Sequence, residues 1–569
     1  MKRFISISIL FLSGVLTLAS CFKNDMPYPY LRGTIVDIDV EGMESMEIDE
    51  LRNTVTLTMN ESRDLRHTQI RSVTYGQAQT YPEKPIVGEQ DLSSPLYVTL
   101  RTYEEQRYIW KIEARQSISR NFSIRDQVGK AVIDEENGRV LVKVGKFASL
   151  SWLKVLDYKL GPAEVTSYWT EDGSAPFDFA SLTNFSEPVN FRVRYHDIDR
   201  LWTLYVERTD KNILINRVSP HSRCAWIDAS GLAGQPNGVK FRPKDALAVP
   251  DGEGEPETEA DEDGWTDVPY EAEGGDFILR IPDLEPQTTY EYFAYTGDEQ
   301  TDVEAFTTED EVQVPNGSFE SVTNVGKYYE WYDALALEER DRTAWWGSGN
   351  GSSVMGISGS ADMGYVICEP DEAVRFTGER SAKLVSRWAV VKFAAGNLFS
   401  GYFGGLEGTK GGKVNYGRPF THRPDTLSCR IRYQCGKVNH VDESCPAPPA
   451  IGDNDCCQIF VALGTWNYKT YGGSPESPIQ VNTTNMTTKF NPKGPDVIAY
   501  GEYTRKESTP AEGEDVEDGW LLVKIPLDYA DSFTVPTHLV ISFASSALGD
   551  YFTGSDQSVL WVDDVRLLY

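Results

Sequence analysis

Carboxylates in the C-terminal part of this 569-residue chain are the side chains best suited to catalysis. Hydrolysis of a glycosidic bond needs two of them, about 5–5.5 Å or 6.5–9.5 Å apart, one with a raised pKa. The chain has 86 acidic residues, so the sequence does not select a pair. Four that lie near aromatic residues and glycines are candidates: Asp496, Glu502, Asp550 and Asp556. Each is also typical of a turn or a surface position.

The sequence motifs of other reaction classes are missing. The stretch from Gly356 to Ser360 ends in serine and therefore fails as the GxSxG elbow of serine hydrolases. The chain has no HExxH pair, phosphate-binding loop or GxGxxG turn. Its six histidines are scattered and show no metal-ligand spacing. We leave the catalytic residues unassigned.

Aromatic side chains suggest a second chemistry, because a flat ring can stack on a sugar ring while polar neighbours read its hydroxyls. The ligand-binding candidates are Trp345, Trp346, Trp466, Tyr402, Tyr468 and Tyr551. Trp345 and Trp346 precede a GSGN run, and Trp466 precedes an asparagine, so these three are preferred as platforms. Core packing is the competing interpretation for each one. Trp520 and Trp561 lie in alternating strands and are expected in the core.

Cysteines are concentrated in one stretch. Seven follow Cys21, and five of these lie between residues 429 and 457. In an exported protein disulfides are the default, and an odd number leaves at least one thiol free or paired between molecules. A zinc site formed by Cys435, His440, Cys445 and Cys456 or Cys457 is the alternative, although no CxxC pair supports it.

Composition excludes several classes of protein. The apolar fraction is 40% and aromatics make up 12%, which is enough to build cores and excludes a disordered chain. The net charge is −32, so nucleic acid is not an expected partner, since that affinity rests on Lys and Arg. The same charge argues against adsorption to an anionic bilayer through basic patches. Neutral sugars and divalent cations remain open as ligands.

The N-terminus predicts export and lipidation. Lys2 and Arg3 precede an apolar run of signal-peptide length that ends in LASC, which resembles a bacterial lipobox. Residues 1–20 are predicted to be the signal peptide, Cys21 the lipidated residue and 21–31 a tether. We expect an outer-membrane lipoprotein that contacts the membrane only through its lipid, with the membrane face undetermined.

Short alternating strands separated by turns predict an all-β chain of about four domains. Residues 91–113 and 184–207 share a proline, two strands and a tryptophan-bearing final strand, and therefore define a repeat of about 90 residues. The two copies, 32–117 and 118–208, resemble immunoglobulin-like sandwiches. Short helices are expected only near 328–342.

Residues 209–309 form a third predicted β module. The run Leu284-x-Pro-x-Thr-x-Tyr290 resembles the fibronectin type III signature, for which Trp226 is the expected core tryptophan. The stretch 250–273 is mostly Asp, Glu, Gly and Pro and is interpreted as a solvated acidic loop within this module.

Residues 310–569 contain six distinctive segments: NGSFE (316–320), WWGSGN (345–350), AGNLFSGYF (395–403), RPFTHRP (418–424), DGW (518–520) and GDYFTGSDQSVLWVDDV (549–565). Together they resemble one family, the putative carbohydrate metabolism domain of Bacteroidetes lipoproteins. The resemblance implies a β-jelly-roll related to carbohydrate-binding modules. The cysteine-rich stretch 435–457 departs from that pattern and looks like an insertion stapled by disulfides.

The resemblance also implies that the first and last strands of this domain lie side by side. In many sugar-binding jelly-rolls their carboxylates hold a structural calcium ion, which needs six to eight oxygen ligands. Glu320, Asp563 and Asp564 are the candidates here. Carboxylates that face water at strand edges are the alternative, and no other cofactor is expected.

The leading hypothesis is an envelope lipoprotein whose sandwich modules project a glycan-binding jelly-roll from the membrane. It would act with other envelope proteins of a glycan-utilisation system. The alternatives are a glycoside hydrolase that uses two carboxylates of the C-terminal domain, and a structural or adhesion stalk. Fold analogy does not decide between them.

Overall fold

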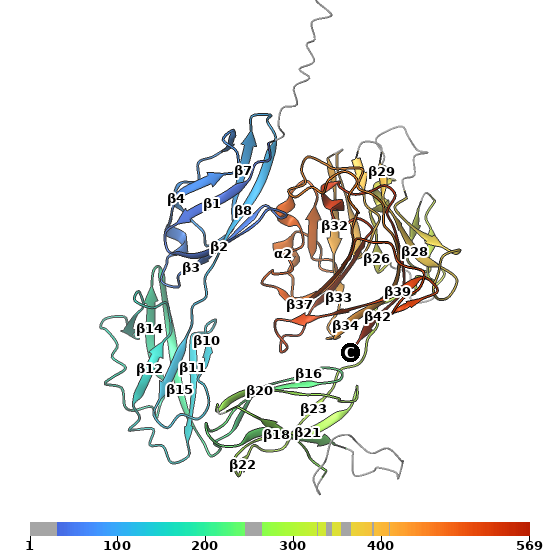
Figure 1. The fold of residues 1–569 in the computed structure, drawn as a ribbon. Helices are drawn as coiled ribbons and strands as arrows, with labels where there is room; N and C mark the ends of the chain where they lie inside the picture. The colour runs from blue at the N-terminus through green and yellow to red at the C-terminus, as the bar shows by residue number, and fades with distance from the viewer. Residues whose placement is uncertain are drawn as a thin grey trace, which may run out of the picture.

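A computed structural model describes residues 31–244, 264–272, 274–326, 328–336, 344–353, 366–389, 392–408 and 410–569. In these residues the chain is almost entirely β-structure, which confirms the predicted fold class (Figure 1). The predicted signal peptide, Cys21 and most of the acidic loop lie outside the described residues. No helix in the described residues is long and apolar enough to cross a membrane.

The first module is a sandwich of two sheets, ordered β1-β4-β6 and β2-β3-β8-β7-β5. Alternate residues of β3, β7 and β8 face inward, and Trp110 on β8 is fully buried at the centre. The strands are β1 (Ile35–Val40), β2 (Met43–Asp49), β3 (Thr54–Met59), β4 (Thr68–Tyr75), β5 (Thr80–Pro82), β6 (Gly88–Gln90), β7 (Leu96–Thr102) and β8 (Arg107–Arg115), with a 3₁₀ turn η1 (Leu65–His67).

The second module repeats the five-stranded sheet of the first. Its order is β10-β11-β15-β14-β13, and β11 pairs in parallel with β15 as β3 pairs with β8. Trp202 on β15 is buried at the position equivalent to Trp110. The strands are β9 (Asn121–Ile124), β10 (Val132–Asp134), β11 (Arg139–Gly145), β12 (Val155–Lys159), β13 (Ser167–Thr170), β14 (Val189–Tyr195) and β15 (Ile198–Thr209), and β9 pairs with β12 in a small second sheet.

The third module packs the sheet β16-β17-β20 on the sheet β19-β18-β21-β22, with β23 also paired to β21. The buried Tyr290 hydroxyl accepts a hydrogen bond from the Glu285 amide at 2.8 Å, the corner contact typical of such sandwiches. Trp226 is only half-buried and Ile227 fills the core, so the prediction for Trp226 was wrong: the pleat turns it outward. The strands are β16 (Leu214–Pro220), β17 (Ala225–Ser230), β18 (Asn237–Pro243), β19 (Thr266–Tyr270), β20 (Asp276–Ile281), β21 (Thr289–Thr296), β22 (Glu299–Gln300) and β23 (Glu304–Thr307).

The C-terminal domain has a nine-stranded sheet and a six-stranded sheet. The main path of the first is β36-β32-β31-β41-β35-β37-β40, with β26 and β33 attached; the second is β27-β28-β42-β34-β39-β38. The strands of the larger sheet are β26 (Trp346–Gly347), β31 (Asn397–Glu407), β32 (Gly411–Tyr416), β33 (Arg418–Pro419), β35 (Cys457–Gly464), β36 (Ile479–Asn482), β37 (Val497–Arg505), β40 (Asp528–Tyr529) and β41 (His538–Ala544). The strands of the smaller sheet are β27 (Cys368–Asp371), β28 (Ser381–Val385), β34 (Thr426–Gln434), β38 (Val516–Glu517), β39 (Trp520–Pro526) and β42 (Val559–Leu568).

Two short hairpins and a few helical turns complete this domain. They are β24 (Thr323–Asn324) with β25 (Tyr329–Glu330), β29 (Arg387–Ala389) with β30 (Lys392–Ala394), α2 (Tyr468–Tyr471), η4 (Gly349–Ser353), η5 (Met486–Thr488) and η6 (Gly549–Tyr551). The described part of 328–342 contains β25 and turns, so no helix forms over 328–336, where one was expected.

Side chains between the two large sheets form the main core of the C-terminal domain. Trp331, Phe319 and Trp346 close one end of this core as a cluster of contacting rings. A second, smaller cluster covers the outer face of the nine-stranded sheet, where Trp466 packs on Phe490 and Phe490 packs on Phe460. Both faces of that sheet are therefore covered.

The third module is fixed to the C-terminal domain by a buried charge network. The Arg423 side chain is almost fully buried, forms an ion pair with Glu309 and donates to the carbonyl of Pro220 at 2.6 Å. The Ser532 carbonyl accepts from Ser219 Oγ at 2.7 Å and from His221 Nε2 at 2.9 Å. This junction joins two modules through several desolvated polar contacts.

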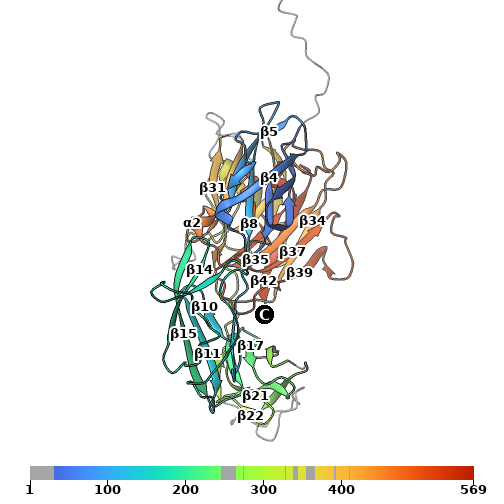
Figure 2. The ribbon, with the colours of Figure 1, turned by 90° about the vertical axis from the view of Figure 1, so that its left-hand side faces the viewer.

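The first module also contacts the C-terminal domain. Arg52 Nε donates to the Phe490 carbonyl at 2.8 Å, Lys493 pairs with Glu47 at 2.7 Å, and Arg32 donates to the Ser444 carbonyl. The four modules therefore close a ring, as Figure 1 shows, and in the side view of Figure 2 the first module lies in front of the C-terminal domain. The expected stalk, with the modules projecting the last domain away, is not the arrangement seen, because the first module folds back onto that domain.

The seven described cysteines are free, so the expected disulfides are not present in the structure. Cys368 and Cys429 are fully buried in different strands, and burial raises the pKa of each thiol to about 12. The alternative zinc site is not found either: the described residues hold no group of three or more His, Cys, Asp or Glu side chains that could hold a metal ion.

Candidate functional site

The preferred tryptophan platforms are mostly in the core. Trp346 is 1% exposed, and its Nε1 donates to the Pro315 carbonyl at 3.0 Å. Trp345 stacks edge-on against it, with ring centroids 4.7 Å apart, and is half-buried. Trp466 is buried against Phe490. Trp346 and Trp466 offer no free ring face, so their predicted role in binding was wrong.

The three tyrosine candidates divide in the same way. Tyr551 is fully buried below Lys489, whose Nζ lies 5.2 Å from the ring centroid, so it was also wrongly predicted as a platform. Tyr402 on β31 and Tyr468 on α2 are partly exposed, and a role in binding stays a prediction for both. As expected, Trp520 is buried, whereas Trp561 is half-buried and donates to Asp371 at 3.0 Å.

The predicted calcium ligands hold a loop. The two ends of the domain do lie side by side, since the Val565 amide donates to the Gly317 carbonyl at 2.9 Å. Asp563 accepts the amides of Phe376 and Thr377 at 2.8 and 2.9 Å, and its burial raises its pKa.

Glu320 accepts two further amides of the same loop, those of Glu379 at 3.0 Å and Arg380 at 3.4 Å. Asp564 pairs with Arg566 at 2.7 Å. These carboxylates therefore have protein donors and do not form one cation cage, and the predicted calcium site is not found at them.

An exposed aromatic surface occurs elsewhere in the domain, on the β29–β30 hairpin. Trp388 on β29 is 46% exposed. Its ring stacks on the imidazole of His440, with centroids 4.7 Å apart and planes 23° apart. Phe393 on β30 packs on the same imidazole at 5.6 Å. The histidine thus packs on both rings, and the indole of Trp388 remains partly open to solvent.

Polar groups surround the stacked rings. Asp556 Oδ1 accepts from Asn439 Nδ2 at 2.6 Å, and Asp556 Oδ2 lies 3.1 Å from His440 Nε2. The hydrogen bond from Asn439, followed by the imidazole, lowers the pKa of Asp556, so this residue is a carboxylate and the imidazole Nε2–H donates to it. Trp388, His440, Asn439 and Asp556 are named here the Trp388 site.

The surrounding chain holds the Trp388 site in place. Asp455 is buried and accepts from the hydroxyls of Ser546 at 2.5 Å and Ser558 at 2.7 Å and from the amide of Ser555 at 2.9 Å. This carboxylate fixes the turn that carries Asp556. Backbone hydrogen bonds between His440 and Gly554, at 3.1 and 2.9 Å, join the cysteine-rich insertion to the same turn. Burial raises the pKa of Asp455.

The Trp388 site combines a flat apolar face with a carboxylate, an amide and an imidazole, which is the chemistry that recognises a sugar ring and its hydroxyls. Trp388 was not among the predicted residues, because it stands in an alternating stretch typical of a core strand. The insertion places His440 against this indole. His440 had been considered only as a zinc ligand, and Asp556 only as one of several acids.

The four acids considered for hydrolysis each interact with different partners and do not form a pair. Asp496 accepts from Tyr471 at 2.5 Å, and Glu502 from Gln458 at 2.6 Å and Tyr500 at 2.8 Å. Asp550 pairs with Lys489 at 2.5 Å. Of these four acids, only Asp556 belongs to the Trp388 site.

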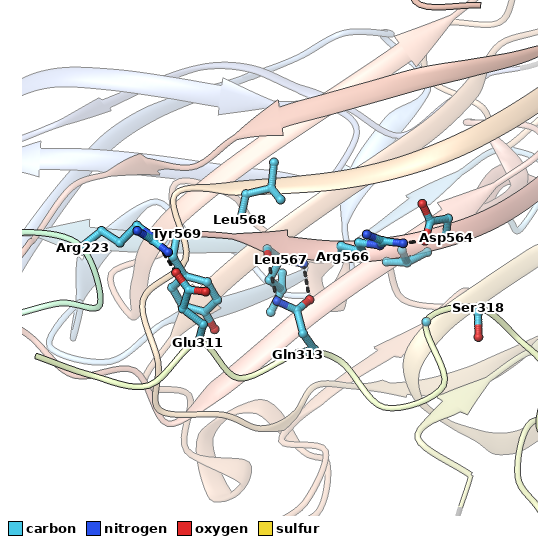
Figure 3. A pocket seen from close by; sticks show the side chains of 11 residues that line it. Arg223, Glu311, Gln313, Ser318, Asp564, Arg566, Leu567, Leu568 and Tyr569 are labelled. Atoms are coloured by element: carbon cyan, nitrogen blue, oxygen red, sulfur yellow. Dashed lines mark hydrogen bonds and ion pairs between the residues drawn. The ribbon is translucent and has the colours of Figure 1, made fainter. Parts of the chain in front are cut away.

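A wide pocket of about 670 Å³ lies where the third module joins the last strand (Figure 3). Its charged lining is largely paired: Arg223 donates to Glu311 at 2.6 Å and Arg566 to Asp564 at 2.7 Å. Gln313 exchanges two hydrogen bonds of 2.8 Å with the backbone of Leu567. The pocket contains none of the predicted sugar-binding aromatics, and we interpret it as part of the junction between the modules.

Comparison with known proteins supports the sequence-based resemblance. The model of the family described as "Putative carbohydrate metabolism domain" matches residues 318–568, which confirms a carbohydrate-related domain at this end of the chain. No curated protein matches the chain.

Solved structures show weaker likeness. A putative glycoside hydrolase from Bacteroides thetaiotaomicron is 16% identical, with 80% of this chain and 96% of that one covered and a TM-score of 0.32. Another from Bacteroides vulgatus is 18% identical, with 44% and 96% covered and a TM-score of 0.31. A structure with a xylogluco-oligosaccharide is 8% identical, with 92% and 98% covered and a TM-score of 0.14. Scores of this size do not establish a shared fold.

Proposed function

We propose that this protein is a lipid-anchored envelope protein that binds a polysaccharide through the Trp388 site of its C-terminal domain. The observation that carries the proposal is the partly open indole of Trp388, stacked on His440 beside the Asp556 carboxylate. The carbohydrate-related family of this domain supports the same ligand class.

The physical basis is the pairing of a stacking surface with fixed hydrogen-bonding groups. Because the indole stacks on His440, which itself packs on Phe393, a sugar that stacks on Trp388 does not have to order a mobile ring. Asp556 and Asn439 already hold each other, and their remaining lone pairs and N–H groups can meet sugar hydroxyls. The Asp556 carboxylate favours neutral glycans over anionic ones at this site, because like charges repel.

Affinity electrophoresis in native gels cast with plant, microbial and mucin polysaccharides tests this function. The protein is the mature chain with Cys21 replaced by serine. We expect retardation by one or two glycans, and we expect Trp388→Ala to abolish it. Ile451→Ala is the matched control, at an exposed position of the cysteine-rich insertion that also carries His440, and it should migrate as the parent does. Retardation that survives Trp388→Ala would show that the ligand binds elsewhere.

The same experiment separates binding from hydrolysis. If the domain is a binder, Asp556→Asn weakens retardation moderately, and no new reducing ends form when the glycan is incubated with the parent protein. Reducing ends that form with the parent and not with Asp556→Asn would favour the hydrolase.

Anchoring through Cys21 at the outer membrane is part of the proposal and rests on the lipobox-like LASC sequence. Lipidation would keep the Trp388 site at the envelope, where other proteins of a glycan-utilisation system act. Fractionation of cells that express the parent or Cys21→Ser tests this step, and the variant should move from the membrane fraction to the soluble one.

A further inference from the structure

The second module carries two aromatic rings that almost entirely face solvent. Phe147 is 91% exposed and Trp152 is 80% exposed. Both belong to the loop 146–154, KFASLSWLK, which connects β11 to β12. We name this loop the aromatic tip. Such exposure is rare for these residue types, and paired in one loop it indicates a surface that another molecule covers.

The aromatic tip is an ordered loop whose aliphatic residues already point inward. Leu153 and Ala148 are buried in the core of the module. The Leu153 amide donates to the Thr183 carbonyl at 3.0 Å, and the Leu150 carbonyl accepts from the Phe185 amide at 2.7 Å. The two rings are therefore held outward while the leucines are used for packing.

The charge of the aromatic tip is opposite to that of the whole chain. Residues 145–156 contain two lysines and no acid, in a protein with a net charge of −32. Lys146, Lys154 and the neighbouring Arg125 are exposed, and none of them makes an ion pair within 4.0 Å with a described residue. Lys146 instead lies over the Phe147 ring, 5.2 Å from its centroid. Unpaired cations beside open rings suit an anionic partner.

We propose that the aromatic tip binds an anionic polysaccharide, with sugar rings on Trp152 and Phe147 and carboxylate groups at Lys146 and Lys154. A lipid surface is the less favoured partner, because the leucines of the loop pack against the core of the module and Ser149 and Ser151 are exposed beside the rings. At physiological salt, screening over about 8 Å makes the local cations matter more than the net charge. The proposal concerns the second module alone and does not depend on the Trp388 site.

The position of the aromatic tip separates it from the first module. The β14–β15 turn contacts that module through Asp197, which pairs with Arg66 at 3.0 Å. From this turn β15 runs twelve residues, about 40 Å, beside the parallel strand β11 to the end of the sandwich that carries the tip. The aromatic tip is therefore clear of the contact between the first two modules.

Binding to immobilised polygalacturonate tests the proposal, with its methyl-esterified form as the neutral match. The protein is the full mature chain with Cys21→Ser. We expect binding to polygalacturonate that weakens with salt, and a loss of about tenfold or more in affinity for Trp152→Ala and for the double variant Lys146→Glu/Lys154→Glu. Val132→Ala and Lys84→Glu, at exposed positions of the second and first modules, are the matched controls and should bind as the parent does.

Three results would overturn the proposal. The first is a parent protein that does not bind polygalacturonate, and the second is binding that the tip variants leave unchanged. The third is tip-dependent binding to vesicles of phosphatidylglycerol and phosphatidylcholine without binding to polygalacturonate, which would assign the tip to lipid. Trp388→Ala should leave binding at the tip intact, so failure of the proposed function and failure of this proposal are distinguishable. Circular dichroism of Trp152→Ala checks that the variant is folded.

Discussion

Arg52 donates its Nε–H to the backbone carbonyl of Phe490 across 2.8 Å, although 438 positions separate the two residues in the chain. The same guanidinium pairs with Asp49 at 2.6 Å, which fixes its direction toward the C-terminal domain. Through this contact the first sandwich of the chain rests on the last domain.

Loss of this contact should open the ring. In Arg52→Ala/Lys493→Ala we expect a larger radius of gyration by small-angle X-ray scattering, because the remaining contacts of the first module are few. The hydrogen bond of the charged Arg52 contributes about 2 kcal/mol, whereas the exposed Lys493–Glu47 pair contributes little. Arg107→Ala removes an exposed ion pair within the first module and should leave the radius unchanged. An unchanged radius in the double variant would show that other contacts hold the ring.

The two tryptophans Trp346 and Trp388 should respond oppositely to substitution. Trp346→Ala removes a core ring and should destabilise the C-terminal domain by about 3–5 kcal/mol in urea unfolding. Trp388→Ala should cost about 1 kcal/mol or less, since its ring is partly exposed, but it should remove glycan binding. Equal destabilisation by both variants would contradict the surface role of Trp388.

His221 should make the junction between the third module and the C-terminal domain sensitive to acid. Burial, followed by the nearby charge of Arg423, lowers the pKa of His221 to about 4. The unfolded imidazole takes up a proton below its ordinary pKa of about 6.5 while the folded one does not, so stability is lost as the pH falls from about 6.5 toward 4. At pH 5 the loss is about 2 kcal/mol.

Comparison of urea midpoints at pH 7 and pH 5 measures this effect. His221→Gln can still donate to the Ser532 carbonyl and should lose less stability between the two pH values than the parent. His67→Gln, at an exposed histidine, is the control. An equal loss in the parent and His221→Gln would assign the acid sensitivity to other groups.

Asp563 should stabilise the C-terminal domain through the loop it holds. Asp563→Ala leaves the amides of Phe376 and Thr377 without their acceptor, at a cost of about 3 kcal/mol in total. Asp564→Ala removes only a partly exposed ion pair with Arg566 and should cost under about 1 kcal/mol. Melting temperatures in calcium chloride and in EDTA complete the test. A calcium-dependent rise in the parent that Asp563→Ala abolishes would restore the predicted metal site.

Local patterns in the sequence predicted the strands well. Trp110 and Trp202 lie in the final strands of the two repeats, and both are buried. This was predictable because strand alternation and hairpin length are encoded within about twenty residues. Tyr290 took its predicted place for the same reason.

The candidate site was harder to predict, because exposure depends on distant segments. The GSGN run after Trp346 suggested an open loop, yet β31 and the Pro315 carbonyl enclose this ring. Trp388 was not predicted to bind, because its contact with His440, some fifty positions later, depends on tertiary structure. Glu320 and Asp563 do lie at adjoining ends of the domain, where backbone amides of residues 376–380 donate to both carboxylates.

The two junctions that the C-terminal domain makes with other modules differ in strength, and this difference has a mechanical consequence. Arg423 and Glu309 are desolvated within the junction of the third module, whereas Arg52 and Lys493 make contacts near the surface. If residue 31 and the C-terminal domain were pulled apart, the load would first fall on the contacts of Arg32, Arg52 and Lys493. Once these contacts break, the molecule could extend by the length of three sandwich modules before any strand had to leave its sheet. The contact between the first module and the C-terminal domain would then break reversibly: it would open under tension and form again when the tension is removed.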